Sequence, residues 1–260
     1  MTTAAGPELH LGDRFSGVSL AELERAAALQ ARVDTKYVVG MAEAQALLDG
    51  LSGFRVLTID GLRCFGYETV YFDTPALTCL HAHRQGRRRR FKVRSRRYLD
   101  SNLCMLEIKR MGGRGETVKH RAGRDPSRHG RMCPDARRFV ADTLRSCYGV
   151  DFREELVPTV VTRYRRITLL APDAEERVTL DLGLNLACDG RGHDLAGGRV
   201  LVETKGTRGY CAADRVLRGL RARPLAAASK YCTAVLLARP DIPPGPFRPA
   251  LRLYLPADPG

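Results

Sequence analysis

The stretch of residues 87–110 constrains the fold of this chain more than any other, because its charged side chains alternate with apolar ones. It reads RRRRFKVRSRRYLDSNLCMLEIKR, which is typical of two β-strands joined by a polar turn at residues 100–102. Successive side chains of a strand point to opposite faces, so the first strand has one cationic and one apolar face. The cationic face comprises Arg88, Arg90, Lys92, Arg94, Arg96 and Tyr98, and the opposite face carries Phe91 and Val93.

The second strand of this predicted hairpin divides its side chains in the same way. One face carries Met105, Glu107 and Lys109, and the other carries Cys104, Leu106 and Ile108. Like charges packed side by side on a sheet destabilise it unless an anion lies between them. The hairpin therefore predicts a surface that holds a polyanion, with Arg87 and Arg89 left at its solvated edge.

The composition agrees with an anionic ligand. The 260 residues carry a formal net charge of +14 and a pI near 9.8, which favours phosphorylated metabolites, polyphosphate, nucleic acid or an acidic membrane surface. Hydrophobic residues make up 44% of the chain, enough to bury a core. The eight cysteines show no C-x-x-C spacing, and no uninterrupted apolar run is long enough to span a bilayer. We therefore expect a soluble cytoplasmic protein with reduced thiols.

Other segments repeat the one-sided charge of the hairpin. Strands are predicted at residues 32–39, 54–59, 67–73, 116–121, 158–170, 177–182 and 200–205, and a hairpin turn at residues 112–115. Helices are predicted at residues 19–30, where Ser19 and Glu22 form a capping box, and at residues 41–49, 134–148 and 214–223. Residues 1–18 and the Pro-rich residues 240–260 are expected to be irregular, which leaves one domain at residues 19–239.

Two architectures satisfy this pattern. An open antiparallel sheet could keep its charged face in water, or a closed β-barrel could enclose a charged bore and cover its apolar outer face with helices. The barrel accounts for more, because it lets groups that are distant in the sequence converge on one ligand. Carboxylates on the cationic faces would then hold a metal or orient Lys and Arg side chains. The open sheet remains an alternative on pattern alone.

Nine short segments carry a family resemblance. They are RVDTKYVV (32–39), YETVYFDT (67–74), KVRSRRY (92–98), LEIKR (106–110), ETVKHR (116–121), YRRITL (164–169), RVTLDLGL (177–184), LVETKG (201–206) and SKY (229–231). In this order they resemble the VTC domain, which is the polyphosphate polymerase domain of the vacuolar transporter chaperone complex and of its stand-alone bacterial relatives. VTC domains belong to the triphosphate tunnel metalloenzymes. The ordered set, rather than any one segment, makes the resemblance specific.

The resemblance implies an α+β fold built on an antiparallel eight-stranded β-barrel, whose basic tunnel threads a triphosphate or polyphosphate. It implies transfer of the terminal phosphoryl group of ATP to a growing polyphosphate chain, with Mn²⁺ or Mg²⁺ in the tunnel. The catalytic residues that it implies are Lys36, Arg94, Arg96, Lys109, Arg166, Arg177 and Lys230. Glu203 matches the metal-binding glutamate, and the residues expected to bind substrate are Arg90, Glu107, Lys119 and Arg121.

The chain departs from related patterns in two respects. Its first matching segment lacks the E-x-E-x-K signature of the triphosphatase and adenylyl cyclase branch, since Asp34 is the only acid there. This departure argues against those activities. The sequence shows no phosphate-sensing SPX domain and no membrane segment, so coupling to transport is expected to be absent or supplied by another protein.

Two other functions stay open. An inorganic or nucleoside triphosphatase on the same fold would need a carboxylate to orient water, and Glu107 is the candidate. A non-catalytic module that binds polyphosphate or RNA would explain the charge without chemistry. Acids recur on the cationic faces and no aromatic stacking platform is interleaved there, which argues against nucleic acid.

Overall fold

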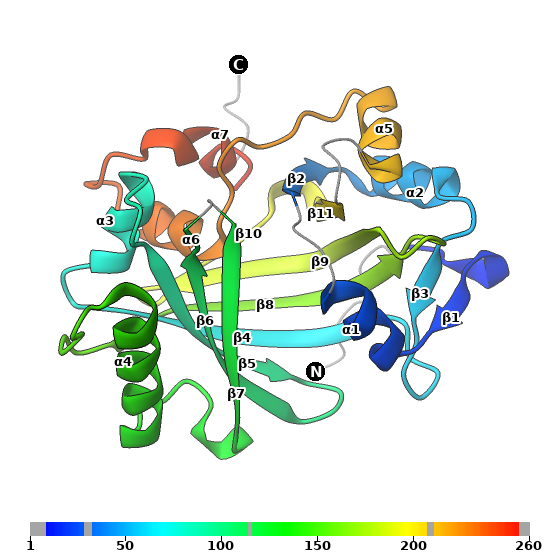
Figure 1. The fold of residues 1–260 in the computed structure, drawn as a ribbon. Coiled ribbons are helices and arrows are strands. Elements are labelled where there is room, and N and C mark those ends of the chain that lie inside the picture. Colours follow the sequence, from blue (N-terminus) through cyan, green and yellow to red (C-terminus); the bar gives the residue numbers. More distant parts are fainter. Residues whose placement is uncertain (1–8, 29–32, 114–115, 207–210, 255–260) are drawn as a thin grey trace, which may run out of the picture.

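The fold is built on one curled β-sheet with helices packed around it (Figure 1). The computed structural model describes residues 9–28, 33–113, 116–206 and 211–254. Within these residues the sheet contains eleven strands and is antiparallel except where β1 (Ser16–Val18) pairs in parallel with β3 (Arg55–Leu57). The α+β architecture expected from the sequence is therefore confirmed.

Eight strands form the main path of the sheet. In order of pairing they are β2 (Val33–Val39), β11 (Val200–Gly206), β9 (Glu176–Cys188), β8 (Val157–Leu170), β4 (Phe65–Asp73), β5 (Phe91–Tyr98), β6 (Leu103–Met111) and β7 (Thr117–Arg124). Beside this path, β3 pairs with the end of β8, and β10 (Arg191–Asp194) pairs with β9. In the described residues β2 and β7, at the two ends of the path, are not paired, so closure into an eight-stranded barrel is not confirmed.

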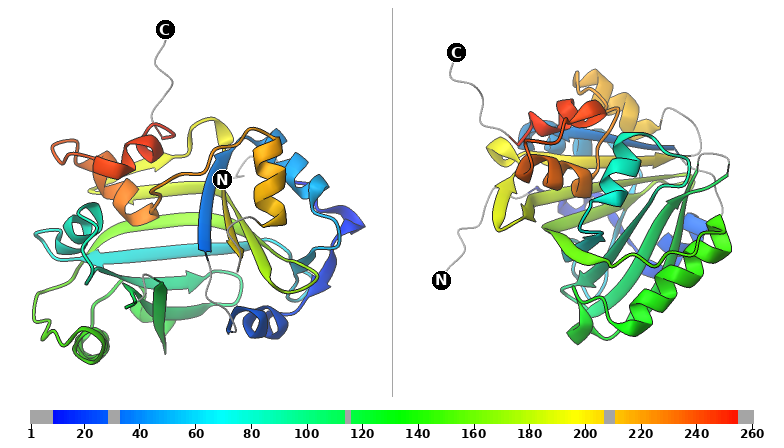
Figure 2. Two further views of the ribbon diagram at one scale, coloured as in Figure 1. Left: turned by 45° about the horizontal axis from the view of Figure 1, so that its top comes forward. Right: turned by 90° about the vertical axis from the view of Figure 1, so that its left-hand side faces the viewer.

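The sheet nevertheless curls far enough for its two halves to face each other (Figure 2). Lys109 of β6 interacts electrostatically with Glu203 and Lys205 of β11, although four strands of the path separate β6 from β11. Lys92 of β5 interacts in the same way with Lys36 of β2, at the far end of the path. We call the concave space between the two halves the lumen, and the sheet face that lines it the lumen face.

Helices cover the convex face of the sheet, where the apolar side chains of the strands lie. α2 (Met41–Gly50) and α5 (Ala212–Gly219) pack over β2, β11 and β9, and Leu47 and Leu217 join Tyr37 and Val202 in one buried cluster. α4 (Pro134–Tyr148) packs over β5 and β6. The apolar half of each alternating strand is thus buried, which leaves the charged half on the lumen face.

The ends of α4 show why the sequence predicts its bounds correctly. The helix begins at Pro134, whose fixed φ suits a first helical turn. It is followed by Gly149, which has a φ of 64° in the left-handed region that favours glycine. Between them Val140 and Leu144 lie on the face that packs with Val93. Local capping signals and an apolar face therefore agree at this element.

The remaining helices lie at the ends of the sheet. α1 (Leu20–Ala28) begins with the predicted capping box, in which the Ser19 N–H donates to Glu22 at 3.0 Å and the Glu22 N–H donates to Ser19 Oγ at 3.3 Å. α3 (Thr78–Arg84) and α6 (Lys230–Ala238) pack beside each other. Tyr231 of α6 contacts Tyr71 on the lumen face, with 5.6 Å between ring centroids. α6 therefore brings its first turn to the lumen.

Residues 9–18 and 240–254 contain more regular structure than their composition indicates. Within residues 1–18, which are expected to be irregular, residues 16–18 form β1. Within the Pro-rich tail, a short 3-10 helix (Gly245–Phe247) and α7 (Arg248–Leu251) bury Phe247 and Ala250 in the core. No helix in the described part of the chain combines the length and the apolar character needed to cross a bilayer.

Candidate active site in the cationic lumen

Lumen-facing side chains of β5, β6 and β7 stand in rows, because these three strands pair in register. The first row, which we call the lysine row, consists of Lys92, Lys109 and Lys119. The second row, two residues further along each strand, is the arginine row and consists of Arg94, Glu107 and Arg121. A carboxylate therefore separates the two arginines, whereas the lysine row has no carboxylate of its own.

Arg94 and Glu107 form a buried ion pair within the arginine row. Glu107 Oε2 lies 2.6 Å from Arg94 Nε and 2.5 Å from its Nη2, and the two side chains are only 1% and 6% exposed, respectively. Glu107 Oε1 lies 3.7 Å from Lys119 Nζ. Burial alone would raise the pKa of Glu107, but Arg94, Arg96 and the neighbouring lysines outweigh it and hold this pKa well below its usual value. Glu107 is thus ionised, with a cation at each oxygen.

The lysine row concentrates positive charge in a buried place. Lys109 makes no hydrogen bond or ion pair with any residue that the structure describes, and Lys92 Nζ reaches only Ser229 Oγ, at 3.5 Å. Arg94 and burial lower the pKa of Lys109 well below its usual value. Burial also lowers the pKa of Lys92, and it lowers the pKa of Lys119 to about 8. Burial and the neighbouring positive charges therefore disfavour the protonated form of these lysines. A bound anion would offset the repulsion between the charges.

Two further arginines of the lumen lie against tyrosine rings. The Cζ atom of Arg96 is 5.4 Å from the ring centroid of Tyr67, and its Nη2 donates to the Tyr164 hydroxyl at 3.1 Å. Arg166 lies 5.4 Å from the centroid of Tyr67 and 5.1 Å from that of Tyr164. These contacts orient the two guanidinium planes, and the rings themselves do not neutralise the positive charges.

Asp181 of β9 holds a second ion cluster in the lumen. Its oxygens accept from Arg166 Nε at 2.6 Å and Nη2 at 2.9 Å, and Asp181 Oδ2 also accepts from Lys230 Nζ at 2.5 Å. Burial would raise the pKa of Asp181, but Arg166 and Lys230 outweigh it and lower this pKa. Lys230 also lies 4.6 Å from the ring centroid of Tyr164. The cluster thus fixes one cation from β8 and one from α6 at the same carboxylate.

Glu203 of β11 forms a third cluster with lysines. Its Oε1 accepts from Lys205 Nζ at 2.9 Å and lies 3.6 Å from Lys36 Nζ, while Lys205 also donates to Asp34 Oδ2 at 2.7 Å. Burial would raise the pKa of Glu203, but Lys205, Lys36 and Lys109 outweigh it and hold this pKa well below its usual value. Glu203 is therefore an ionised carboxylate inside a cationic lumen.

The carboxylates of the lumen determine how a divalent cation could bind there. In the described part of the chain no three His, Cys, Asp or Glu side chains gather closely enough to hold a metal ion by themselves. Glu203 offers one ionised carboxylate, with Asp34 nearby across the shared Lys205. Mg²⁺ and Mn²⁺ are often held by one or two carboxylates together with substrate phosphates. The residues present fit an ion that arrives with a phosphate ligand, and they do not fit a protein-only site.

The other predicted site residues, Arg177, Arg121 and Arg90, differ in how they relate to these clusters. Arg177 stands beside Lys205 in register, at the start of β9. Arg121 belongs to the arginine row, but its Nη1 lies 3.3 Å from Glu24 of α1, and both side chains are largely exposed. Arg90 precedes β5, and its Nη1 donates to the carbonyl oxygens of Gly86 and Arg87 at 3.2 and 2.8 Å, so its partners are in its own loop.

Some lumen residues were missing from the predicted site, among them Lys92, Asp181 and Tyr71. Lys92 shares the cationic face of β5, so alternation alone could have included it. Asp181 alternates with Arg177, but its role depends on partners from β8 and α6. Tyr71 accepts from Arg94 Nη1 at 3.3 Å, and although burial would raise its pKa, Arg94 and other cations outweigh it and lower it. The sequence gives no charge signal for Tyr71.

Comparison with known proteins gives one family match. The family model described as VTC domain matches residues 31–239. No curated protein matches the chain.

Several solved structures show a distant likeness. A candidate adenylate cyclase from Bacillus halodurans is 13% identical, with 77% of this chain and 95% of that chain covered and a TM-score of 0.48. A candidate adenylate cyclase from Vibrio parahaemolyticus is also 13% identical, with 78% and 97% covered and a TM-score of 0.43. A candidate adenylyl cyclase from Hippeastrum, described as having a dominant triphosphatase activity, is 16% identical, with 78% and 94% covered and a TM-score of 0.44.

At these identities and TM-scores, the structural likenesses carry no argument about activity. The family match does establish which family the chain belongs to, because it spans most of the chain and nearly all of the lumen strands. It includes every one of the predicted site residues, from Lys36 to Lys230. The chain belongs to the VTC domain family.

Proposed function

We propose that this protein is an ATP-dependent polyphosphate polymerase, which transfers the terminal phosphoryl group of ATP to a growing polyphosphate chain in the lumen. The observation that carries the proposal is the state of the lumen carboxylates. Within the described residues, a Lys or Arg side chain binds each of these carboxylates. The carboxylates are Glu107, Asp181, Glu203 and Asp34. Hydrolysis would need a carboxylate to orient water, whereas a phosphate acceptor is already anionic and needs no general base. Membership of the VTC domain family supports the same choice.

The proposed reaction needs in-line positioning and charge neutralisation more than covalent chemistry from the protein. An oxygen of the terminal phosphate of the chain attacks the γ-phosphorus of ATP. The bond from that phosphorus to the bridging oxygen breaks, and ADP leaves with the electron pair. The lumen residues that we assign to gripping phosphate oxygens are Arg94, Arg96, Lys109, Arg166 and Arg177.

The ion clusters set the roles of the other residues. Lys36 and Lys230, held by Glu203 and Asp181, would neutralise the transferring phosphoryl group or the chain end. Lys119 and Arg121 would extend the cationic wall toward the open edge of the sheet. Glu107 would orient Arg94 rather than water, since Arg94 binds its Oε2 through two nitrogens. Arginine can fork two phosphate oxygens, whereas lysine acts as a mobile point charge.

A divalent ion, Mn²⁺ or Mg²⁺, would be held by Glu203 together with phosphate oxygens of the substrate. Such an ion supplies further neutralisation of phosphate charge when it is bound. Lys36 and Lys205 keep Glu203 ionised and in place at the wall of the lumen.

The decisive test is to incubate the pure protein with ATP and Mn²⁺ and to analyse the products. We expect ADP together with acid-stable polyphosphate. Orthophosphate without polymer would overturn the proposal in favour of a triphosphatase. No turnover at all, combined with tight and salt-sensitive RNA binding, would favour a non-catalytic module.

A pair of variants on one strand ties this activity to the lumen. Arg166→Met removes a lumen guanidinium and should reduce polymer synthesis by at least about a hundredfold. Arg163→Met on the same strand is the matched control, because Arg163 is exposed and binds Glu68 at 2.6 Å outside the lumen. Equal loss in both variants would place the activity elsewhere.

A further inference from the structure

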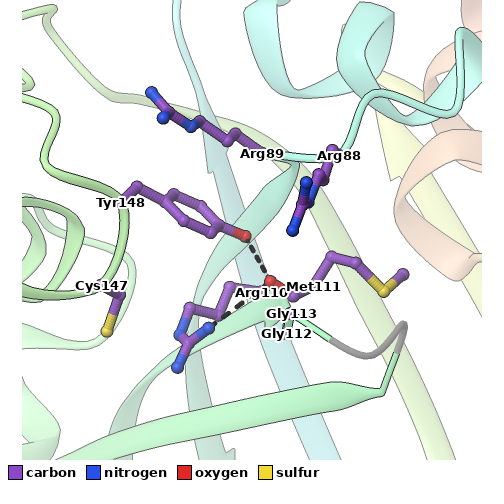
Figure 3. Close-up of a pocket in the computed structure, with 8 residues that line it drawn as sticks. All are labelled: Arg88, Arg89, Arg110, Met111, Gly112, Gly113, Cys147 and Tyr148. Atoms are coloured by element: carbon purple, nitrogen blue, oxygen red, sulfur yellow. Dashed lines mark hydrogen bonds between the residues drawn. The ribbon is translucent and has the colours of Figure 1, made fainter.

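A second cationic site lies outside the lumen, at the end of β6. A pocket of about 680 Å³ opens there on the convex side of the sheet (Figure 3). Arg88 and Arg89 line it from the segment before β5, Arg110 and Gly112 from the end of β6, and Tyr148 from the end of α4. Three of its lining side chains are therefore guanidinium groups, contributed by two separate segments of the chain.

These guanidinium groups lack acidic partners. Arg88 and Arg89 are exposed, and neither makes a hydrogen bond or ion pair with any residue between 9 and 254 that the structure describes. Arg110 donates from Nε to His120 at 3.1 Å and from Nη1 to the Met111 carbonyl at 3.5 Å, so its known partners are neutral acceptors. No Asp or Glu is among the described residues that line the pocket. The pocket thus presents positive charge to an acceptor from outside.

The wall of the pocket is fixed before any ligand binds. The Tyr148 hydroxyl lies 2.9 Å from the carbonyl oxygens of both Arg90 and Met111. The Met111 N–H donates to that same Arg90 carbonyl at 3.1 Å. The Arg110 Cζ lies 5.8 Å from the centroid of the Tyr148 ring. The ends of β5, β6 and α4 are therefore joined at one point, and Arg110 is held in place there. A cation that is already oriented binds an anion at a lower cost in entropy.

The pocket lies on the opposite face of β6 from the lysine row. Lys109 and Arg110 are consecutive residues, so they lie on opposite faces of the same strand. Lys109 belongs to the lysine row of the lumen, and Arg110 faces the pocket. Beyond them the Glu116 carboxylate lies against Gly112, while Gly113 has open space around it. The lysine row and the pocket therefore share one strand end, with Lys109 on one face of it and Arg110 on the other.

We propose that the pocket binds the part of a linear polyphosphate chain that extends beyond the lumen. This inference rests on the proposed function, because it assigns the pocket to the same anionic chain. Guanidinium groups suit the purpose, since each can bind two oxygens of a phosphate unit and none can lose its proton. Single-stranded RNA fits the pocket less well, because the Tyr148 ring that could stack on a base is in contact with Arg110.

The test is a charge-removing double variant with a matched control. Arg88→Gln/Arg89→Gln removes two charges from the pocket and leaves every residue assigned to the lumen intact. Arg137→Gln/Arg138→Gln removes two charges from exposed positions of α4 that do not line the pocket. Calorimetry without ATP would measure the affinity of each protein for tripolyphosphate, for long-chain polyphosphate and for a single-stranded RNA.

We expect the pocket variant to lose about tenfold or more in affinity for long-chain polyphosphate, while its affinity for tripolyphosphate changes less than about twofold. The control variant should bind both ligands almost as the unmodified protein does. Equal losses for both ligands, equal losses in both variants, or no loss at all would overturn the proposal. So would a loss confined to RNA.

Failure of this inference is distinguishable from failure of the proposed function. The binding experiment involves no turnover, whereas the polymerase is tested by product analysis. If the unmodified protein forms no polymer but only the pocket variant loses long-chain affinity, the pocket still binds polyphosphate and the catalytic proposal falls. If polymer forms and the variant binds long chains normally, the pocket proposal falls alone.

Discussion

Arg94 of β5 and Glu107 of β6 lie opposite each other, and Arg94 Nε and Nη2 both lie within 2.6 Å of Glu107 Oε2. Glu107→Gln keeps the shape of the side chain but removes the charge that compensates a buried arginine. We expect the free energy of unfolding to fall by about 3 kcal/mol in urea denaturation. Saturating tripolyphosphate should restore much of this loss, because phosphate would replace the missing negative charge. An unchanged urea midpoint would contradict the prediction.

An exposed ion pair provides the control for this variant. Asp135 lies 3.2 Å from Arg128, but both side chains are more than half exposed. Asp135→Asn should leave stability almost unchanged, because solvent screens such pairs. It should also show no added response to tripolyphosphate.

Lys109 and Lys230 differ in their partners and should respond in opposite directions. Lys109→Met removes a buried cation that has no ion pair in the described residues, so stability without ligand should rise by about 1 kcal/mol. Lys230→Met should lower stability, because it removes a partner that binds Asp181 at 2.5 Å. Both variants should bind tripolyphosphate at least about tenfold more weakly by calorimetry. If Lys109→Met lowered stability instead, the prediction would be wrong, because the Lys109 charge would then be stabilised by other groups of the folded protein.

The lysine row should take up protons when a phosphate chain binds. Burial lowers the pKa of Lys119 to about 8, with Glu107 opposing this shift and Arg121, Arg94 and Arg96 adding to it. A bound anion favours the charged form, so its pKa should rise again. At about pH 8.5 we expect uptake of roughly one proton per bound chain, measured by calorimetry in buffers with different ionisation enthalpies. Proton release would contradict the prediction, and Lys119→Gln should reduce the uptake.

The same shift has a consequence for the protein without ligand. Between about pH 8 and pH 10.4 the unfolded chain keeps a proton on this lysine that the folded protein has lost. Because the unfolded state then binds more protons, the contribution of Lys119 to stability increases as pH rises through this window. Lys119→Gln should flatten that part of the stability profile in urea denaturation.

Glu203→Gln tests the proposed metal ligand. Glu203 is ionised, and the variant would keep its size while losing its charge. We expect Mn²⁺ affinity in the presence of tripolyphosphate to fall by about tenfold or more, measured by electron paramagnetic resonance of free Mn²⁺. Glu176→Gln is a suitable comparison, because Glu176 instead accepts from the backbone N–H groups of Ala212 and Ala213. Full Mn²⁺ affinity in Glu203→Gln would refute the assignment.

The position of α6 should depend on Tyr231, whose hydroxyl donates to Asp73. Tyr231→Phe removes this hydrogen bond, while Asp73 keeps the backbone N–H groups of Thr74, Cys79 and Leu80. We expect a loss of about 1 kcal/mol in the free energy of unfolding and weaker tripolyphosphate binding through Lys230. Tyr98→Phe is the control, since Tyr98 contacts Tyr67 through its ring. Equal effects of the two variants would argue against this role of α6.

The hairpin of β5 and β6 was predictable because alternation is a local property of the chain. The bounds of α4 were predictable for a similar reason, since its Pro and Gly signals are local. The rows of the lumen were not, because they depend on which residues of different strands pair. The register that sets Lys92 beside Lys109 is fixed by the turn, in which Asn102 adopts a φ of 53°.

The limits of the pattern are visible at particular residues. Alternation placed Arg90 on the cationic face. However, β5 begins at Phe91, and the alternation of side chains between two faces holds only within a strand. Asp181 was not assigned a role because its partners come from β8 and α6. Prolines suggested an irregular tail, yet Pro249 lies in the first turn of α7, where a helix tolerates it. Tertiary contacts decided each of these cases.

Under the proposed function, binding of polyphosphate at the lysine row would also affect the lifetime of the protein. A polyphosphate chain that binds the folded lumen but not the unfolded chain stabilises the fold by mass action, by about 2.7 kcal/mol when its free concentration is a hundred times the dissociation constant. In a cell, stability differences of this size change how often a protein opens to proteases. If the proposed function is correct, cells rich in polyphosphate should therefore keep this protein longer than cells starved of phosphate.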